Sequence, residues 1–166
     1  VIIKLADRLH NMNTLEYLPE NKRKRIAEET MEIFVPIADR LGIGEMKGDL
    51  EDLSFKFIDP EAYQYVKNLE EKHYREIEQY VDKTIEELEV DLKRDSVKII
   101  EIKGRAKRIH SLYLKLKQHD MDINRIYDLA AIRIIVPNIA DCYETLGIVH
   151  KKYHPLVGRI KDYISL

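Results

Sequence analysis

Residues 95–104, Asp-Ser-Val-Lys-Ile-Ile-Glu-Ile-Lys-Gly, divide the sequence into two parts of different character. Isoleucine and valine are concentrated over residues 97–103, which favours a β-strand that ends at the following glycine. A second apolar run, Ala-Ala-Ile-Arg-Ile-Ile-Val at residues 130–136, predicts a second strand. Helical periodicity follows each run, over residues 105–119 and around residues 141–150. The sequence after residue 95 therefore predicts an α/β unit.

Shorter helices are expected in the first part of the chain. Apolar residues recur at helical spacing over residues 2–15, 19–41 and 46–57. Pro36 lacks the backbone N–H that an uninterrupted helix needs, so we expect the second helix to bend or split there. Gly42 follows that helix and gives a stop signal.

A longer helix is expected from Pro60 to about Lys93. Asp59 is a favoured helix cap, and proline is favoured in the first helical turn. Apolar residues step along this segment by three or four between many Glu and Lys residues, which is typical of a connecting helix packed along one stripe. Together with the unit after residue 95, these helices predict an α+β chain.

Composition narrows the class of protein. The 166 residues carry a net charge of −2, and 45% of them are hydrophobic, which is the balance of a soluble globular domain. No global basic field points to nucleic acid, and no apolar run has the ~20 residues of a membrane span. Cys142 is the only cysteine, so an internal disulfide is excluded and the cytoplasm is the expected compartment. The chain begins without Met, and we expect an internal fragment of a longer protein.

The first helix presents polar groups opposite its apolar residues. Asp7, Asn11 and Thr14 are four and three residues apart, so they share one helical face. A carboxylate can bind a hard divalent metal, while an amide and a hydroxyl can hold a sugar or a base edge. A solvated polar face explains the same spacing, and a metal needs more ligands than Asp7 supplies.

A basic cluster, Gly-Arg-Ala-Lys-Arg at residues 104–108, opens the helix expected after the first strand. A helix N-terminus offers unpaired N–H groups and a positive dipole end to a phosphate. Lys107, Ser111 and Lys115 follow at intervals of four, opposite the apolar stripe, which suits a polyphosphate. A solvated basic face explains this pattern equally well, and the Walker pattern is absent.

Two further groups lie near the expected strands. Asp128 directly precedes the second strand, where a carboxylate can hold Mg²⁺ between nucleotide phosphates, although a turn aspartate is the ordinary alternative. Gly-Arg-Ile-Lys-Asp-Tyr at residues 158–163 offers Arg159 and Lys161 to phosphates, although the same residues also make an ordinary charged loop.

Several stretches, taken in order, resemble the RelA/SpoT family of enzymes. No single stretch decides the resemblance, which is carried by their order and spacing along essentially the whole chain. Two examples are Lys-Leu-Ala-Asp-Arg-Leu-His-Asn-Met at residues 4–12 and Tyr-Asp-Leu-x-Ala-x-Arg-Ile-Ile-Val at residues 127–136. The remaining stretches lie at residues 40–43, 50–55, 104–107, 141–143, 146–150 and 158–163.

The resemblance implies two enzymatic domains. The family couples an all-α hydrolase of the HD type, which uses Mn²⁺ to remove the 3′-pyrophosphate of (p)ppGpp, to a nucleotidyltransferase-like synthetase. The synthetase uses Mg²⁺ and moves pyrophosphate from ATP to the 3′-hydroxyl of GDP or GTP. By resemblance, residues 1–45 are the end of the hydrolase, residues 46–95 are a helical connector, and residues 96–166 are the first half of the synthetase. The expected setting is the bacterial stringent response, with these nucleotides as partners and without direct binding to a membrane or a nucleic acid.

The resemblance assigns roles on the hydrolase side to the first helix. Asp7 matches the family's last Mn²⁺ ligand, and Asn11 and Thr14 match residues that line the nucleotide pocket. Intact Asp7 and Asn11 resemble bifunctional members, because members that only synthesise usually lose the hydrolase residues.

On the synthetase side, the resemblance assigns ATP phosphates, a metal and the acceptor nucleotide to separate residues. The Mg²⁺ carboxylate matches Asp128, and the basic form of the loop at residues 158–163 again resembles bifunctional members. The ATP-phosphate contacts match Arg105, Lys107 and Lys115, with Ser111 beside them, and the acceptor side matches Arg159 and Lys161.

Departures from the family pattern leave other hypotheses open. Asn13 stands where Arg is usual, Asp39 where His is usual and Ala106 where Pro is usual. The family's upstream His and His-Asp ligands are not in this sequence, nor are its downstream stacking Tyr and catalytic Glu, so we expect the isolated fragment to be inactive. One alternative is a degenerate, non-catalytic nucleotide-binding or coupling module of the same family. Another is an unrelated helical interaction protein.

Overall fold

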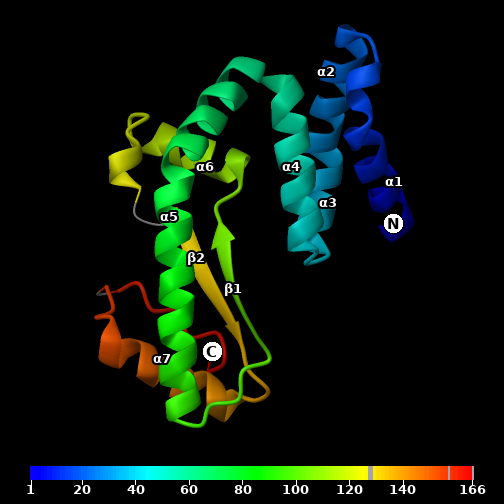
Figure 1. The fold of residues 1–166 in the computed structure, drawn as a ribbon. Helices are drawn as coiled ribbons and strands as arrows, with labels where there is room; N and C mark the ends of the chain where they lie inside the picture. The colour runs from blue at the N-terminus through cyan, green and yellow to red at the C-terminus, as the bar shows by residue number, and fades with distance from the viewer. Residues whose placement is uncertain (127–128, 157, 166) are drawn as a thin grey trace. The chain divides into compact units, whose positions relative to one another are not determined.

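The structure of the chain, a computed structural model, describes residues 1–126, 129–156 and 158–165, apart from the side chains of residues 73–76 and 105–106. The chain folds as two units (Figure 1). The first unit is formed within residues 1–73 and 107–129, and the second within residues 74–106 and 130–166.

The first unit begins with a series of short helices. Helix α4 packs against the three helices that precede it and, in the same unit, against α6. The elements up to α4 are α1 (Ile2–Asn13), a 3-10 turn (Leu15–Tyr17), α2 (Glu20–Glu29), a π-helical turn (Thr30–Phe34), α3 (Val35–Arg40) and α4 (Gly44–Ile58).

The helix expected over residues 19–41 is divided close to Pro36, as predicted. Pro36 lies at the start of α3, directly after the π-helical turn, and a wider turn accommodates a residue that lacks an N–H and crowds the turn before it. At the other end of α3, the Ile43 N–H donates to the Ala38 carbonyl and the Gly42 N–H to the Asp39 carbonyl, both at 3.0 Å. With Gly42 at a φ of +70°, this is a Schellman motif, so the predicted stop is confirmed.

The helices of the first unit enclose an apolar core. The face predicted for the first helix is confirmed in part, because Leu5 and Met12 are buried whereas Ile2 is 63% exposed. The buried residues of this core are Leu5, Met12, Leu15, Ala27, Val35, Ala38 and Leu50.

The long helix α5 (Pro60–Arg94) begins as predicted, and its first part packs on α6 (Ile109–Gln118). The Asp59 carboxylate accepts a hydrogen bond from the Ala62 N–H at 3.0 Å, so Asp59 is a helix cap. Between these helices lies a second apolar core, to which a 3-10 turn at Ile123–Arg125 contributes. Its buried residues are Val66, Leu112, Leu116, Ile123 and Ile126.

The second unit contains an antiparallel pair of strands, β1 (Glu101–Ala106) and β2 (Ala130–Ile135), beside the later part of α5 (Figure 1). Glu101 lies opposite Ile135, and Ala106 lies opposite Ala130. Helix α7 (Ile139–Lys152) follows, and its Ile148 packs with Leu92 and Val97.

The first strand and the helix after it begin later than predicted. The strand expected over residues 97–103 occupies residues 101–106, and the helix expected from residue 105 begins at Ile109. Val97 is buried in the core without belonging to the ladder, which is why its apolar character was misleading. The second strand and the last helix agree with the predicted positions.

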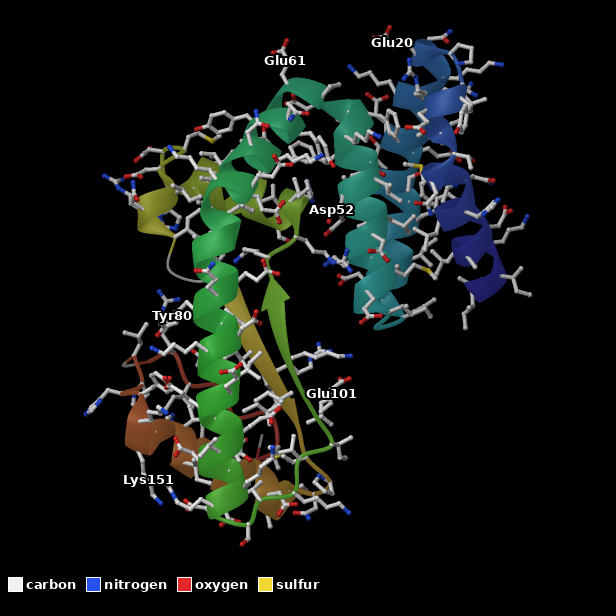
Figure 2. All side chains as sticks on the ribbon, in the orientation of Figure 1. Glu20, Asp52, Glu61, Tyr80, Glu101 and Lys151 are labelled. Atoms are coloured by element: carbon white, nitrogen blue, oxygen red, sulfur yellow. The ribbon has the colours of Figure 1, made fainter. Side chains whose placement is uncertain are left out.

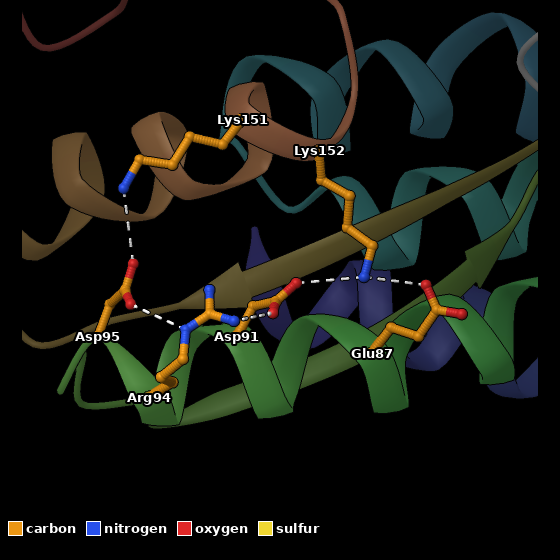
Figure 3. A network of polar contacts seen from close by, with 6 residues as sticks. All are labelled: Glu87, Asp91, Arg94, Asp95, Lys151 and Lys152. Carbon is orange, nitrogen blue, oxygen red and sulfur yellow. Dashed lines mark hydrogen bonds and ion pairs between the residues drawn. The ribbon is translucent and has the colours of Figure 1, made fainter.

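Ion pairs join the C-terminal turn of α7 to α5 (Figure 3). Lys152 Nζ lies 3.0 Å from Glu87 Oε2 and 3.1 Å from Asp91 Oδ2, and Lys151 Nζ lies 3.7 Å from Asp95 Oδ2. Cations in this position also complement the negative end of the α7 dipole. The contact fixes the end of α7 within the second unit.

The fold class is α+β, as predicted: mostly helices, with a small antiparallel sheet. Across the part of the chain that the structure describes, no helix combines the length and the apolar composition that crossing a membrane requires.

Candidate functional site

The candidate hydrolase residues lie on the exposed side of α1 and at its C-terminal end. Asp7, Asn11 and Thr14 are all exposed, while Leu5 and Met12 are buried on the opposite side of the same helix. The Thr14 hydroxyl donates to the Asn11 carbonyl at 3.2 Å, which fixes the end of the helix. The structure therefore leaves the carboxylate, the amide and the hydroxyl accessible on one side.

Arg8, which the sequence reasoning did not single out, anchors this helix. Its guanidinium Nη2 lies 3.2 Å from Glu29 Oε1, and its Cζ lies 4.1 Å from the centre of the Phe34 ring. The guanidinium also donates to the hydroxyl of the buried Thr30. Because Arg8 directly follows Asp7, these contacts set the orientation of the α1 face that carries Asp7. In the sequence, the only indication of this anchoring role is that Arg8 lies next to Asp7.

The described residues do not make a complete metal site. Asp7 offers one carboxylate, and no group of three or more His, Cys, Asp or Glu side chains in the described part of the chain is placed to hold a metal ion. A transition metal such as Mn²⁺ takes several nitrogen and oxygen ligands.

Two of the departures from the family pattern make local contacts. The Asn13 amide donates to the Leu9 carbonyl of its own helix at 3.0 Å. Asp39 Oδ1 lies 2.9 Å from Lys47 Nζ, and this hydrogen bond raises the pKa of the lysine. The third departure, Ala106, has a side chain outside the described residues.

The candidate phosphate-binding residues lie on and just before α6, in the first unit. Ser111 and Lys115 are half-buried and one turn apart on the helix, whereas Lys107 precedes the helix and is not part of its face. The Lys107 N–H donates to the carbonyl of Leu129 at 3.1 Å. This bond joins the start of α6 to the residue after Asp128. Asp128 itself and the side chain of Arg105 lie outside the described residues.

At the start of α6, one of the N–H groups that the sequence analysis offered to a phosphate already has a partner. The His110 N–H donates to Asp52 Oδ1 of α4 at 2.9 Å, so a carboxylate already caps this end of the helix (Figure 2). Arg108 lies over α4, with its Nη1 2.6 Å from Asp49 Oδ1 and its Nη2 donating to the Glu45 carbonyl. Arg108 therefore contributes to helix packing rather than to the exposed basic cluster that the sequence suggested.

Burial dominates the electrostatics of Asp52. It raises the pKa of the carboxyl above its usual value, while the His110 N–H and the Arg108 guanidinium act in the opposite direction. The Asp52 side chain is 23% exposed, and its Oδ2 lies 3.7 Å from Arg108 Nη1. Both partners stabilise the ionised form that caps α6.

The candidate acceptor residues lie in the loop after α7, in the second unit. Arg159 and Lys161 are exposed there. Asp162 beside them accepts hydrogen bonds from the Ile164 N–H at 2.8 Å and from the Tyr143 hydroxyl of α7 at 3.0 Å. These bonds, together with those from Ser165, lower the pKa of Asp162 to about 2. The loop that presents the two cations is thus attached to α7.

Comparison with known proteins identifies both ends of the chain. Residues 1–44 match the HD domain, and residues 104–166 match the region found in RelA / SpoT proteins. The chain is 42% identical over its full 166 residues to a probable guanosine-3′,5′-bis(diphosphate) 3′-pyrophosphohydrolase of Synechocystis, of which it covers 22%. It is 41% identical, again over its full length, to a GTP pyrophosphokinase of Myxococcus xanthus, of which it also covers 22%.

A third relative supports the same assignment. A guanosine-3′,5′-bis(diphosphate) 3′-pyrophosphohydrolase of Haemophilus influenzae is 42% identical over the whole chain, which covers 24% of that protein. The chain thus spans between a fifth and a quarter of the length of these relatives. The HD-domain match precedes the RelA/SpoT match, and each of these relatives aligns with the full length of the chain at about 42% identity. These matches leave one conclusion: the chain belongs to the RelA/SpoT family.

Proposed function

We propose that this chain is the central part of a bifunctional enzyme that hydrolyses the 3′-pyrophosphate of (p)ppGpp and also transfers pyrophosphate from ATP to the 3′-hydroxyl of GDP or GTP. The observation that carries the proposal is that one chain combines an HD-domain match with a RelA/SpoT-region match. The proposed setting is the bacterial cytoplasm and the stringent response, and the proposed partners are these nucleotides.

The hydrolase half of the proposal rests on the exposed side of α1. Asp7 is accessible there as one ligand for Mn²⁺, to be joined by ligands from the rest of the longer protein. Asn11 and Thr14 lie on the same side and carry the groups that hold a nucleotide. The contacts of Arg8 with Glu29 and Phe34 keep this side of the helix in one orientation.

The synthetase half rests on α6 and the loop after α7. Lys107, Ser111 and Lys115 are the proposed contacts to the ATP phosphates, with Arg105 beside them and Mg²⁺ at Asp128. Because Asp52 caps the start of α6, side chains rather than the amide of His110 are proposed to hold the phosphates. Arg159 and Lys161 are proposed to contact the acceptor nucleotide from their exposed positions.

The two activities are tested on the chain extended at both ends to the length of its relatives. With ppGpp and Mn²⁺, the extended protein is expected to release pyrophosphate, and Asp7→Ala is expected to abolish the release because the metal loses a ligand. With ATP, GDP and Mg²⁺, it is expected to form ppGpp, and Lys107→Ala is expected to slow this reaction only. Each variant serves as the folding control for the other.

The same two assays also distinguish the bifunctional proposal from the alternative of a degenerate module. A well-folded extended protein that neither hydrolyses nor synthesises ppGpp would be a degenerate module of the family, and the proposal would be wrong. Synthesis without hydrolysis would restrict the function to the reaction proposed for α6 and the loop after α7, and the bifunctional proposal would be wrong.

A further inference from the structure

Helix α4 holds Arg108, the residue before the first turn of α6, by three polar contacts. Arg108 Nη1 lies 2.6 Å from Asp49 Oδ1 and 3.7 Å from Asp52 Oδ2, and Nη2 donates to the Glu45 carbonyl at 3.1 Å. The Arg108 side chain is only 25% exposed. An arginine fork that is held at several points loses little freedom for each bond it makes, so its position is well defined.

Gly48 makes room for this side chain on the surface of α4. A Cβ built on Gly48 would overlap Nε and Cδ of Arg108 and would lie 2.7 Å from its Cζ. A glycine inside a helix lowers helix stability relative to alanine, so its presence in α4 is explained by the guanidinium that lies across it. Gly44, in the same helix, has open space around its Cβ position.

A second contact ties the same two helices together. The Asp52 carboxylate caps α6 through the His110 N–H, so α4 supplies a tertiary N-cap in place of a local one. Beside it, the Phe55 ring of α4 stacks on the Tyr113 ring of α6 with centroids 4.6 Å apart. We call the group Gly48, Asp49, Asp52 and Arg108 the Arg108 clamp.

We propose that Arg108 is a positioning residue for ATP, which acts by clamping the start of α6 onto α4 so that Lys107, Ser111 and Lys115 are held in their phosphate-binding arrangement. The inference rests on the proposed synthetase function. Lys107 directly precedes Arg108, and Ser111 lies three residues after it, so a change in the backbone at Arg108 is transmitted to both. The Arg108 guanidinium points to α4, where it contacts Asp49, Asp52 and the Glu45 carbonyl.

Gly48→Ala tests the clamp without a substitution in α6 itself. The new methyl group displaces the flexible Arg108 side chain, while alanine favours the helical conformation of α4. Thermal unfolding of the intact protein is measured alongside, because the helical preference of alanine and the lost contacts of Arg108 act on stability in opposite directions. In ppGpp synthesis from ATP and GDP, KM for ATP is expected to rise about tenfold with a much smaller change in kcat, as misplaced binding groups would cause. Gly44→Ala, in open space, is the matched control and should keep the wild-type KM for ATP.

Arg108→Ala should raise KM for ATP as much as Gly48→Ala does. The double variant should have the same KM as either single variant, because all three variants remove the same contacts between Arg108 and α4. Hydrogen exchange of the peptide 107–118, measured by mass spectrometry, should be faster in Gly48→Ala than in Gly44→Ala. An active wild type with equal KM for ATP in Gly48→Ala and Gly44→Ala would overturn the positioning role.

If the wild type forms no ppGpp, the proposed function is wrong. The positioning role of Arg108 is then tested by measuring the affinity for a non-hydrolysable ATP analogue by calorimetry. Weaker binding in Gly48→Ala alone would still support it. Equal affinity in both variants, or no binding by any form of the protein, would overturn it.

Discussion

At the scale of single residues, the absence of a side chain determines how two pairs of elements approach each other. Gly48 admits the Arg108 guanidinium to the surface of α4, and Gly104 admits the Val81 side chain of α5 to the surface of β1. A Cβ on Gly104 would lie 2.6 Å from Val81 Cγ1 and 3.6 Å from Ile85 Cδ1. The partner at Gly48 is the flexible end of a long side chain, but the partner at Gly104 is a short, branched one that cannot move aside.

Gly104→Ala is therefore expected to destabilise the second unit. The added methyl group must push α5 away from the sheet, and such overpacking costs about 1–3 kcal/mol. Gly147→Ala in α7 is the matched control, because nothing lies within 4 Å of its Cβ position, and it should add about 0.5–1 kcal/mol of stability. Urea denaturation of both variants measures the difference, and equal midpoints would contradict the close contact at Gly104.

At the scale of elements, sequence patterns located the starts of α5 and β2 but not those of β1 and α6. The start of α5 followed from Asp59 and Pro60, because a cap acts through neighbouring residues. The start of β1 did not follow from residues 97–100, because a strand begins where its partner begins to pair, and Ile100 is the first of these residues bonded to β2, at Ile135. The amino-acid composition of a segment does not determine which of its residues pair with the neighbouring strand.

The candidate site shows the same division between local and distant causes. The shared exposed side of Asp7 and Asn11 was predictable, because it depends only on helical spacing. The cap that Asp52 places on α6 was not, because the two partners are 58 residues apart in the sequence. Arg108 was assigned to the basic cluster for the same reason, since its acidic partners on α4 become visible only in the folded chain.

The loop that follows α7 should loosen in acid through a single carboxylate. The folded-state pKa of Asp162 is about 2, below its ordinary 3.8, so the ionised form is favoured by folding. Its contribution is present above about pH 4 and is lost as the pH falls through about 2. Carbon NMR of the Asp162 carboxyl should show this low midpoint. Tyr143→Phe removes one donor and should raise the midpoint, whereas Tyr163→Phe should leave it unchanged; equal midpoints in the two variants would contradict the contact.

At the scale of the whole molecule, the packing units do not follow the family matches. The HD-domain match ends at residue 44, yet the helices within it share one unit with α4 and with α6 from the RelA/SpoT region. Helix α4 contacts α1, α2 and α3 and also holds α6. The proposed hydrolase residues on α1 and the proposed ATP contacts on α6 therefore belong to one packing unit, and α4 contacts both helices.

The isolated chain of 166 residues is expected to be inactive in both reactions, although it carries residues of both proposed sites. Its described part holds no group of three potential metal ligands, and a single carboxylate such as Asp7 cannot hold Mn²⁺ firmly. The measurement compares the isolated chain with the extended protein at equal concentration, with nucleotides separated by ion-exchange chromatography and with circular dichroism to establish that the isolated chain is helical. Turnover by the isolated chain that is lost on Asp7→Ala would show that ligands within these residues suffice, and the need for groups from the rest of the protein would then be wrong.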